Sequence, residues 1–397
     1  MPKILCVTSH DLDGPEQGAS LRARSVFKLL ARHGEVHVAL ASWHDPWGEH
    51  PNETCGGFKL VRRIRFARTP NISPLDRLRH ELDPRFLNTD WVSPSDEDRT
   101  WLEKALGDYD LIWIHGVHIA NRFGRWHWPR TILDIDDIPS ELYRTNLPLA
   151  HGIKAKARCR WRGYLWRRSE KLFPERFAAL CVCSQPDREK FDGRANVHVV
   201  PNGFAVPEKR VPRSPARPPR VGFIGNFAHG PNRQGIHWFV KTIWPLIRAR
   251  SPEAELRIVG AKSQERDWPA GQGIQPLGWV AEVEGEMATW ALTVVPILAG
   301  GGTRVKMAEA FGRRCPVVST ALGAYGYDVT DGQDIFIADD VEGFAGRCLE
   351  LMENPAAGER LAENAWGKFI QLWTWEAQAG RIAAVVEQAL AAPKLKP

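Results

Sequence analysis

One pattern occurs twice in this chain of 397 residues and limits its fold more than any other feature. A basic residue, a short apolar run and a glycine-bearing loop lead into a helical segment, first from "KILCVTSH" (3–10) and again from "RVGFIGNF" (220–227). Apolar strands that alternate with helices are typical of parallel sheets covered on both faces. The sequence therefore predicts an α/β protein with two doubly wound domains.

A proline-rich stretch separates the two copies of the pattern. The segment "VPEKRVPRSPARPPR" (206–220) holds five prolines and five basic residues without apolar periodicity, which is typical of a stiff, exposed linker. We therefore expect an N-terminal domain over 1–205, a linker over 206–219, a second domain over 220–374 and a C-terminal helix over 375–397. Residues 43–100 show no clear pattern. Further strands of the first domain are expected at 110–116, 130–136, 179–184 and 197–203.

Composition excludes several classes of protein. The net charge of +6 is too small to indicate a nucleic-acid partner. The seven cysteines are scattered without the spacing of metal ligands, so we expect them to be reduced and mostly buried. The apolar run Ile4–Val7 is too short for a signal peptide, and no run approaches the roughly 18 residues of a membrane span. A cytoplasmic location is therefore expected.

The stretch "LAGGGTRVKMAEAFGRRCPVVST" (298–320) carries the strongest functional signal. Because it follows the apolar run "LTVVPIL" (292–298), Gly300, Gly301 and Gly302 are expected at a strand-to-helix turn on the carboxyl edge of the second sheet. Glycines there let a ligand approach the bare backbone, and the helix start offers N–H groups and a partial positive charge. The arrangement predicts a phosphate site; the alternative is a plain tight turn.

Three charged side chains follow the glycines. Arg304 offers guanidinium donors, and Lys306 adds a further positive charge for a phosphate. Glu309 lies three residues beyond Lys306 on the same helical face, where its carboxylate can accept hydrogen bonds from vicinal hydroxyls such as those of a ribose. The set predicts a grip on a nucleoside diphosphate, or otherwise a solvated helix face.

Residues 220–345 resemble the nucleotide-binding half of retaining GT-B glycosyltransferases of the "group 1" or family 4 type. The likeness rests on "PILAGGGTRVKMAEAFGRRCPVVSTALGAYGY", on "VGFIGNFAHGPNRQGIHWFVKTIWPLI", and on "LRIVGAK", "PLGWV" and "VVPNG" in the same order; the N-terminal half fits more loosely. The resemblance implies two Rossmann-like domains facing a cleft, a nucleotide-sugar donor on the C-terminal domain and an acceptor on the N-terminal one. It also implies that the final helix crosses back to the N-terminal domain.

The resemblance assigns roles to individual residues. It implies that Glu309 holds the donor ribose, that Gly302 and Thr303 face the diphosphate, and that Leu277 and Gly278 border the base.

The sequence departs from the family where the family carries charge. The first glutamate of the family's E-x7-E pair falls on Gly301, its arginine near Asn226, and its following lysine near Arg233 or Gln234. The acid that usually touches the sugar is therefore missing. Phosphate charge must be met by Arg233 or by the two cations that follow the glycines.

Candidates in the N-terminal domain lie in loops after strands. Gly18 and Arg22 look like the family's close-approach glycine and helix-start arginine at the donor, or else form a plain turn and a solvated arginine. The resemblance implies a histidine that touches the donor sugar, and His118 is expected to fill this role rather than His115. The segment "DIDD" (134–137) is expected to form a cleft edge or a helix cap, and no metal site is expected.

The segment "KAKARCRWRGYLWRRSEK" (154–171) has eight basic residues and one acid, interleaved with aromatic residues. It predicts either a helix that rests on anionic lipid or a solvated helix whose aromatic side chains pack inward.

Together these features predict a cytoplasmic, metal-independent hexosyl- or related glycosyltransferase, without a cofactor beyond its nucleotide-diphosphate-sugar donor. It would transfer a sugar with retention to a glycan or lipid-linked acceptor in surface-polysaccharide or glycolipid biosynthesis, with His118, Arg304 and Lys306 as catalytic residues. Peripheral contact with the inner face of a membrane would involve residues 154–171. The alternatives are an inactive GT-B-like binding or scaffold protein, favoured by Gly301, and a nucleotide-sugar epimerase or hydrolase on the same fold.

Overall fold

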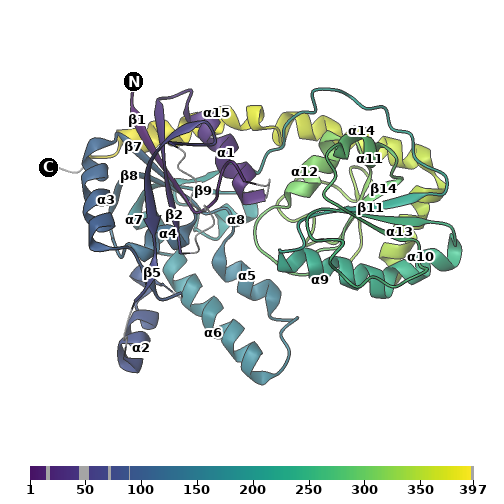
Figure 1. The fold of residues 1–397 in the computed structure, drawn as a ribbon, viewed down its shortest axis with the longest axis horizontal. Coiled ribbons are helices and arrows are strands. Elements are labelled where there is room, and N and C mark those ends of the chain that lie inside the picture. The colour runs from purple at the N-terminus through teal and green to yellow at the C-terminus, as the bar shows by residue number, and fades with distance from the viewer. Residues whose placement is uncertain (15–17, 44–52, 70–72, 89, 395–397) are drawn as a thin grey trace. The chain divides into compact units, whose positions relative to one another are not determined.

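The computed structural model describes residues 1–14, 18–43, 53–69, 73–88 and 90–394, and the chain forms two compact units (Figure 1). Unit 1 comprises residues 1–201 together with 378–397, and unit 2 comprises residues 202–377. The divisions lie near, but not at, the boundaries of 205 and 374 expected from the sequence.

Unit 1 is built on a sheet that, within the described residues, has eight strands in the order β10-β9-β8-β7-β1-β2-β4-β3. Neighbouring strands are parallel, except that β3 and β4 are antiparallel. The central strand, β1, is a continuous apolar run because both faces of the sheet are covered. Its residues Ile4 to Val7 are at most 1% exposed. The strands are β1 (Lys3–Thr8), β2 (Glu35–Ser42), β3 (Thr54–Cys55), β4 (Phe58–Arg65), β7 (Leu111–His115), β8 (Trp128–Asp134), β9 (Phe177–Val182) and β10 (Val197–Val199).

Helices connect these strands and cover the sheet (Figure 1). A separate pair of short strands, β5 (Ala67–Arg68) and β6 (Val92–Ser93), is antiparallel. The helices of unit 1 are α1 (Gly18–Leu30), α2 (Pro74–Leu82), the 3₁₀ turn η1 (Pro84–Phe86), α3 (Asp96–Asp108), α4 (Val117–Arg122), α5 (Pro139–Asn146), α6 (Ile153–Glu170), α7 (Phe173–Arg176) and α8 (Gln185–Glu189).

Unit 2 has a second parallel sheet, whose six strands within the described chain run in the order β13-β12-β11-β14-β15-β16. Its strands are β11 (Arg220–Ile224), β12 (Glu255–Val259), β13 (Ile274–Gly278), β14 (Leu292–Val295), β15 (Val317–Ser319) and β16 (Phe336–Ile337). Its helices are α9 (Gly230–Trp238), α10 (Trp244–Arg250), α11 (Val283–Ala288), α12 (Val305–Gly312), α13 (Val341–Glu353) and α14 (Pro355–Leu372). The π-helical turn η2 (Phe239–Ile243) joins α9 to α10 just before Pro245, which has no backbone N–H to continue the α-helical ladder.

The proline-rich segment lies along unit 2. Its residues form neither helix nor strand, and most are exposed. Two backbone hydrogen bonds nevertheless attach it, from Ser214 N–H to the Ala288 carbonyl (2.9 Å) and from Ala216 N–H to the Thr289 carbonyl (2.8 Å). The segment is therefore extended and anchored on one unit.

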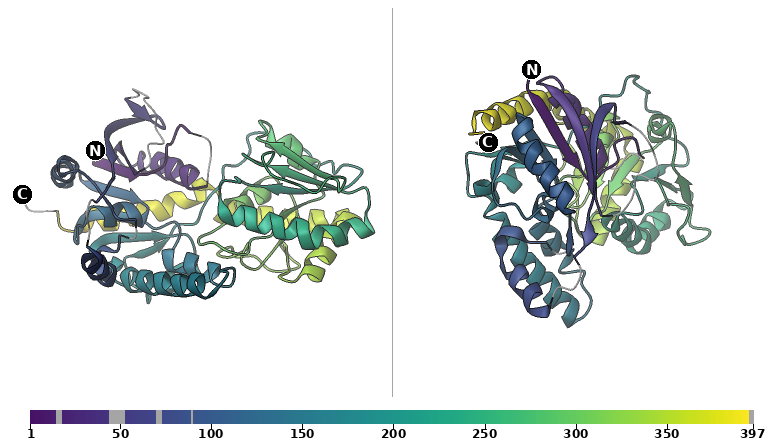
Figure 2. Two further views of the ribbon diagram at one scale, coloured as in Figure 1. Left: turned by 60° about the horizontal axis from the view of Figure 1, so that its bottom comes forward. Right: turned by 60° about the vertical axis from the view of Figure 1, so that its left-hand side comes forward.

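The last helix, α15 (Trp375–Ala391), starts in unit 2 and belongs to unit 1 from Gln378 onward, as Figure 2 also shows in yellow. Within unit 1 its Gln388 side chain contacts His198, and the Ala392 carbonyl after it accepts a hydrogen bond from Arg130 Nε (2.8 Å).

Two expectations from composition can be compared directly with the structure. All seven cysteines are free and six of them are buried, with Cys159 partly exposed, which confirms that they pack as reduced side chains. No helix within the described chain is both long and apolar enough to cross a lipid bilayer.

Candidate functional site

The topology of unit 2 indicates where a ligand site would lie. The chain runs outward from β11 through β12 to β13 and then returns to place β14 on the other side of β11. The loops that leave β11 and β14 therefore diverge at the switch point of the sheet, where open parallel α/β sheets bind ligands at the carboxyl ends of their strands. The glycine turn, residues 296–304, is the loop that leaves β14.

The β11 loop begins with a close approach between two backbones. A Cβ atom on Gly260, which follows β12, would lie 2.0 Å from the Gly225 carbonyl oxygen, and Gly260 has φ of 134°. Both conditions require glycine at this position. The edge of the sheet is thus kept bare of side chains beside the switch point.

Two of the three consecutive glycines are required by their backbone conformation. Gly300 has φ of 121° and Gly302 has φ of 62°, values that disfavour an L side chain. A Cβ on Gly300 would also lie 3.3 Å from Pro231 Cγ. The next residue is held in place by a hydrogen bond from Asn202 Nδ2 to Thr303 Oγ1 (3.0 Å).

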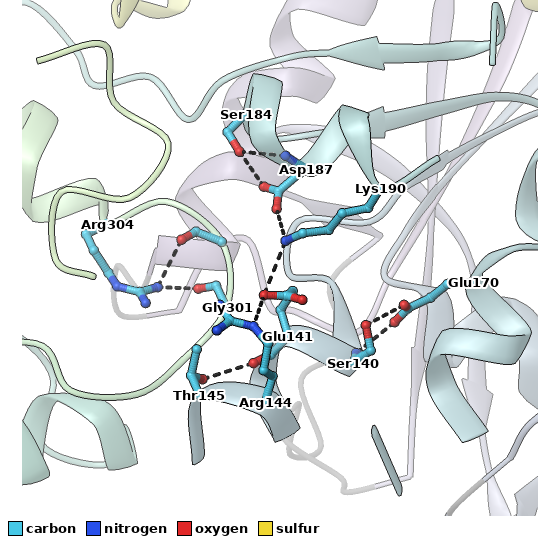
Figure 3. Close-up of polar contacts among 11 residues, drawn as sticks. Ser140, Glu141, Arg144, Thr145, Glu170, Ser184, Asp187, Lys190, Gly301 and Arg304 are labelled. Atoms are coloured by element: carbon cyan, nitrogen blue, oxygen red, sulfur yellow. Dashed lines mark hydrogen bonds and ion pairs between the residues drawn. The ribbon is translucent and has the colours of Figure 1, made fainter. Parts of the chain in front are cut away.

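Arg304 braces the glycine turn. Its Nη1 donates hydrogen bonds to the carbonyl of Gly301 and to that of Gly302 (3.2 Å), as Figure 3 shows. Its own carbonyl accepts a hydrogen bond from the Tyr327 hydroxyl (2.8 Å). The positive charge therefore lies against the turn itself, directly before the first residue of α12.

Lys306 reaches from α12 to β11 and the start of α9. Its Nζ donates to Asn232 Oδ1 on α9 (2.8 Å) and lies 4.2 Å from the centre of the Phe223 ring on β11. Burial and, to a lesser extent, the charge of Arg304 lower the pKa of this ammonium group from 10.5 to about 7, and Glu309 partly opposes the shift. A ligand anion beside Nζ would restore its charge.

Two polar side chains fix the backbone of the loop that follows β11. Arg233 Nη1 donates to the carbonyls of Phe227 (2.8 Å) and Ala228 (2.7 Å), and Asn226 Oδ1 accepts the N–H of Ala228 (2.8 Å). Burial lowers the pKa of His229, and the nearby charges of Arg304, Lys306 and Arg233 act in the same direction. The site is thus a concentrated positive region formed by two loops.

Glu309 forms an ion pair within its own helix. Its carboxylate lies 2.8 Å from Arg313 Nη1, and the Glu309 side chain is only 15% exposed. Arg313 also pairs with Glu284 (2.9 Å), so the guanidinium has a second carboxylate partner.

The residues expected at the base, Leu277 and Gly278, end β13. Gly278 has φ of 72° and donates its N–H to Ser263 Oγ (2.9 Å). The adjacent Trp279 is 74% exposed, which is unusual for so large an apolar side chain. An aromatic face is thus presented next to the carboxyl end of the sheet.

Unit 1 carries a buried polar cluster at its own switch point, between β1 and β7. Arg22 has no exposed side-chain surface and forms a bidentate pair with Asp134 (2.7 Å from Nη2 and 3.0 Å from Nε), while its Nη1 donates to the Val200 carbonyl (2.9 Å). His115 Nδ1 lies 3.1 Å from Asp134 Oδ2, and the rings of His115 and His10 meet edge to face at 5.5 Å.

The charges in this cluster are fixed by their neighbours. Burial raises the pKa of Asp134, but the Arg22 charge and the hydrogen bonds from His115 and Arg22 outweigh it and hold the pKa at about 2. Because an ionised carboxylate can only accept, His115 Nδ1 donates to it. Burial, with the adjacent His115, lowers the pKa of His10 to about 4, so its imidazole is uncharged at neutral pH.

The structure separates the N-terminal candidates. Arg22, expected as a helix-start arginine at the donor, is in the second turn of α1 and fully enclosed. His118 lies on α4, exposed, with its ring 5.0 Å from that of Trp166, whereas His115 joins the buried cluster. Gly18 is exposed and is the first residue of α1.

The expectation that "DIDD" (134–137) caps the following helix is wrong. The N-cap of α5 is Ile138, without a side-chain cap hydrogen bond. Asp134 is used by Arg22 and His115 instead, and Asp136 Oδ1 accepts a contact from Cys183 Sγ (3.4 Å).

The start of α5 is fixed by further polar contacts (Figure 3). Glu170, whose pKa burial raises to about 7, accepts hydrogen bonds from the backbone N–H (2.7 Å) and hydroxyl (2.5 Å) of Ser140. Lys190 lies between Glu141 (3.3 Å) and Asp187 (3.2 Å). These contacts tie α5 to α6 and α8 of the same unit.

Within the described part of the chain, one group of side chains has the proximity of metal ligands. Ligand atoms of Asp11, Asp13 and Cys55 lie within 4.8 Å of one another. Burial raises the pKa of the Cys55 thiol to about 11, and Asp13 accepts the N–H of Gly56 (3.0 Å).

Comparison with known proteins relates unit 2 to one family. Residues 218–354 match the family described as "Glycosyl transferases group 1". A protein of Klebsiella pneumoniae, described as an uncharacterized 44.6 kDa protein in the cps region, is 26% identical over 161 residues, which are 38% of this chain and 41% of that protein. The alignment thus spans less than half of either chain.

Solved structures with the same fold cover nearly the whole chain. Sucrose-phosphate synthase from Thermosynechococcus elongatus has a TM-score of 0.71 at 18% identity, over 98% of this chain and 100% of that one. Anabaena Alr3699/HepE in complex with UDP and glucose has a TM-score of 0.62 at 17% identity over 98% and 100%. WaaG, a glycosyltransferase involved in lipopolysaccharide biosynthesis, has a TM-score of 0.59 at 14% identity over 96% and 99%. The likeness establishes the fold, which is of the GT-B class.

Proposed function

Residues 218–354 form a group 1 glycosyl transferase domain, and on that premise we propose that the protein transfers a sugar from a nucleotide-diphosphate donor to a glycan or lipid-linked acceptor. The diphosphate would lie at the switch point of unit 2, between the glycine turn and the β11 loop. The ribose would lie at Glu309, and the base beside Leu277 and Gly278.

The observation that carries this proposal is the position of Lys306. The sequence lacks the family's cations in the β11 loop, but Lys306 brings an ammonium group from α12 to within 2.8 Å of Asn232, at the start of the helix that follows that loop. The pKa of about 7 reflects how unfavourable the charged form of this buried amine is without a counter-charge. A diphosphate would supply that counter-charge. Arg304 and the first N–H groups of α12 add to the same positive region.

These groups act where charge develops during transfer. The bond that breaks joins the anomeric carbon to a diphosphate oxygen, so negative charge grows on the leaving phosphate. Fixed cations and N–H groups at that phosphate stabilise the transition state more than the bound donor. Lys306 and Arg304 would supply this stabilisation without a metal ion. Retention of configuration is proposed because the chain resembles retaining enzymes.

Unit 1 would bind the acceptor. Its polar cluster at the β1/β7 switch point includes His115, and His118 lies on the next helix. Either imidazole could contact sugar hydroxyls, and His118 remains the proposed one. WaaG, described as acting in lipopolysaccharide biosynthesis, supports a glycan or glycolipid product.

One feature favours a second candidate function. Gly301 takes the place of the family's acid at the sugar, and its carbonyl is occupied by Arg304. A protein that binds nucleotide sugars without transferring them would have no need of that acid. Donor binding is common to both candidates, and turnover separates them.

The test is an incubation of the purified protein with UDP-, GDP-, ADP- and dTDP-sugars, with and without glycan and lipid-linked acceptors. Nucleotide release that rises with acceptor supports transfer. Binding by thermal shift without turnover supports the binding protein, and free epimerised or hydrolysed sugar supports an epimerase or hydrolase. Absence of both binding and turnover across the panel contradicts the proposal.

A further inference from the structure

Helix α2 leaves an apolar face about half exposed among the described residues of unit 1. None of its nine residues is buried, and its three leucines are 58% (Leu75), 49% (Leu78) and 42% (Leu82) exposed. Their spacing of three and four residues places them on one side of the helix. A helix that contributes no side chain to the core of its own unit leaves this apolar side in contact with solvent.

Helix α6 is strongly basic, and its side chains are buried at one end only. Seven of its 18 residues are lysine or arginine, against one glutamate. Its buried residues, Leu165, Trp166, Ser169 and Glu170, all lie in the C-terminal third. The N-terminal two-thirds project from the unit and carry the exposed lysines and arginines.

The aromatic residues of α6 divide between the two environments. Trp166 packs into the core of unit 1 at 1% exposure, whereas Trp161 and Tyr164 are 40% and 54% exposed and stack on each other with ring centres 6.0 Å apart. Ile153, at the free end of the helix, is 89% exposed. The alternative that all aromatic side chains pack inward is therefore wrong for two of the three.

The two helices lie side by side on the same part of unit 1 (Figure 1). Arg168 Nη1 donates to the Leu82 carbonyl (3.3 Å), and Arg162 lies 3.7 Å from Glu81. The C-terminal end of α2, which includes Leu82, thus contacts cationic side chains of α6, the helix that also carries Trp161 and Tyr164.

We propose that α2 and α6 form a docking surface for an anionic lipid bilayer, with the leucines of α2 entering the acyl boundary and the basic residues of α6 contacting the lipid phosphates. Leucines at helical spacing bury well at a membrane interface, amphipathic tryptophan and tyrosine suit the headgroup region, and clustered lysine and arginine attract anionic headgroups. The surface is independent of the donor site, which lies in unit 2.

A bilayer fits this surface better than a nucleic acid or a folded protein does. Nucleic acid offers phosphates but no apolar phase for three exposed leucines. A protein partner would need a surface that is at once acidic and apolar, whereas an anionic bilayer supplies both properties everywhere. These other partners are outcomes of the test.

The experiment is co-sedimentation of the full chain, without nucleotide, with vesicles of phosphatidylcholine alone or with about 30% phosphatidylglycerol. Wild-type protein should bind the anionic vesicles at low salt, should not bind pure phosphatidylcholine, and should be released in part as salt rises. Charge reversal by Lys156→Glu with Arg160→Glu should weaken binding more than tenfold, since each basic residue at an anionic surface contributes about fivefold.

Two matched controls separate the surface from net charge and from general apolarity. Lys209→Glu with Lys241→Glu makes the same change in net charge on exposed residues of unit 2 and should leave vesicle binding within about twofold. Leu75→Asp with Leu78→Asp should abolish the binding that persists at high salt, whereas Leu246→Asp, at a leucine of unit 2 that is 40% exposed, should not. Unchanged thermal unfolding of each variant shows that it has folded.

Several results would overturn the proposal: no binding to anionic vesicles at low salt, equal binding to both kinds of vesicle, or full binding by the charge-reversed α6 variant. Binding to duplex DNA without binding to vesicles would identify a different partner and also overturn it. Because the assay contains no donor or acceptor, its failure would leave the proposed sugar transfer unaffected, and failure of transfer would leave the vesicle result unaffected.

Discussion

The pKa of Lys306 makes donor binding a measurable function of pH. The ammonium form attracts a diphosphate and the free amine does not, so Lys306 contributes its full share of affinity below its pKa of about 7 in the unliganded protein. As the pH rises above this value, the affinity for the donor falls. The fall ends when the pH reaches the higher pKa that Lys306 acquires beside the ligand. An arginine guanidinium does not titrate in this range. Burial and the neighbouring cations lower the pKa of His229, which moves its titration away from that of Lys306.

The size of the effect follows from the shift. At pH 6 about nine-tenths of Lys306 is charged, and at pH 8.5 only about 3% is, if the pKa is 7. Affinity for the donor should therefore fall about 30-fold between these values, or about 2 kcal/mol, provided the pKa in the complex stays above about 9. At pH 8.5 the complex should take up about one proton.

The assay is titration calorimetry with UDP-glucose, or with whichever nucleotide sugar stabilises the protein most, in buffers of different ionisation enthalpy. A nucleotide sugar is suitable because its diphosphate does not titrate between pH 6 and 8.5. Lys306→Arg is the control, since its charge persists and its pH profile should be flat. Wild-type affinity that is independent of pH, without proton uptake at pH 8.5, would show that the ammonium group does not meet the diphosphate.

Three further outcomes are expected. Glu309→Gln should weaken donor binding about ten- to a hundredfold by calorimetry if the carboxylate holds the ribose. Arg313 keeps Glu284 as an ion-pair partner in this variant, so its charge stays paired. Unchanged donor affinity would rule out the proposed role of Glu309. Asp134→Ala should destabilise unit 1 by about 3–5 kcal/mol in denaturant titration, because it leaves the Arg22 charge buried without its partner. The control Asp76→Ala, at the exposed pair with Arg79, should cost under about 1 kcal/mol. Similar losses of stability in both variants would contradict the account of a buried ion pair. Transfer should proceed at the same rate in EDTA, and a loss restored by a divalent cation would disprove metal independence.

Local features of the sequence were sufficient to predict much of unit 2. The glycine turn lies between an apolar strand and a helix that are adjacent in the chain, so its place at the sheet edge depends only on short-range order. The positive φ of Gly300 and Gly302 gives the reason for two of the glycines, while Gly301 has no such requirement within the described backbone.

Long-range pairings could not be predicted in the same way. Lys306 meets Asn232 across 74 residues, and Arg22 meets Asp134 across 112. Nothing local distinguishes Arg22 from a solvated arginine. Asp134 and His115 do end neighbouring strands of a parallel sheet, and that shared edge is the signal that could have brought them together.

Residues 43–100 were unclear from the sequence because their elements bury little. β4 is mostly partly exposed near the edge of its sheet and lacks the strict alternation of a half-buried strand. α2 does carry Leu75, Leu78 and Leu82 at helical spacing, and this is the signal that could have indicated a helix there. α3 could have been found, since Ser95 precedes it and accepts the N–H of Asp98 (3.1 Å) in a recognisable N-cap.

The most direct test is a crystal structure of the protein with bound UDP or the nucleotide selected by thermal shift. Both phosphates should lie at the start of α12, with backbone N–H groups of residues 302–304 and Lys306 Nζ within hydrogen-bond distance. Phosphates bound at another edge of unit 2, with Lys306 still directed only to Asn232, would contradict the account.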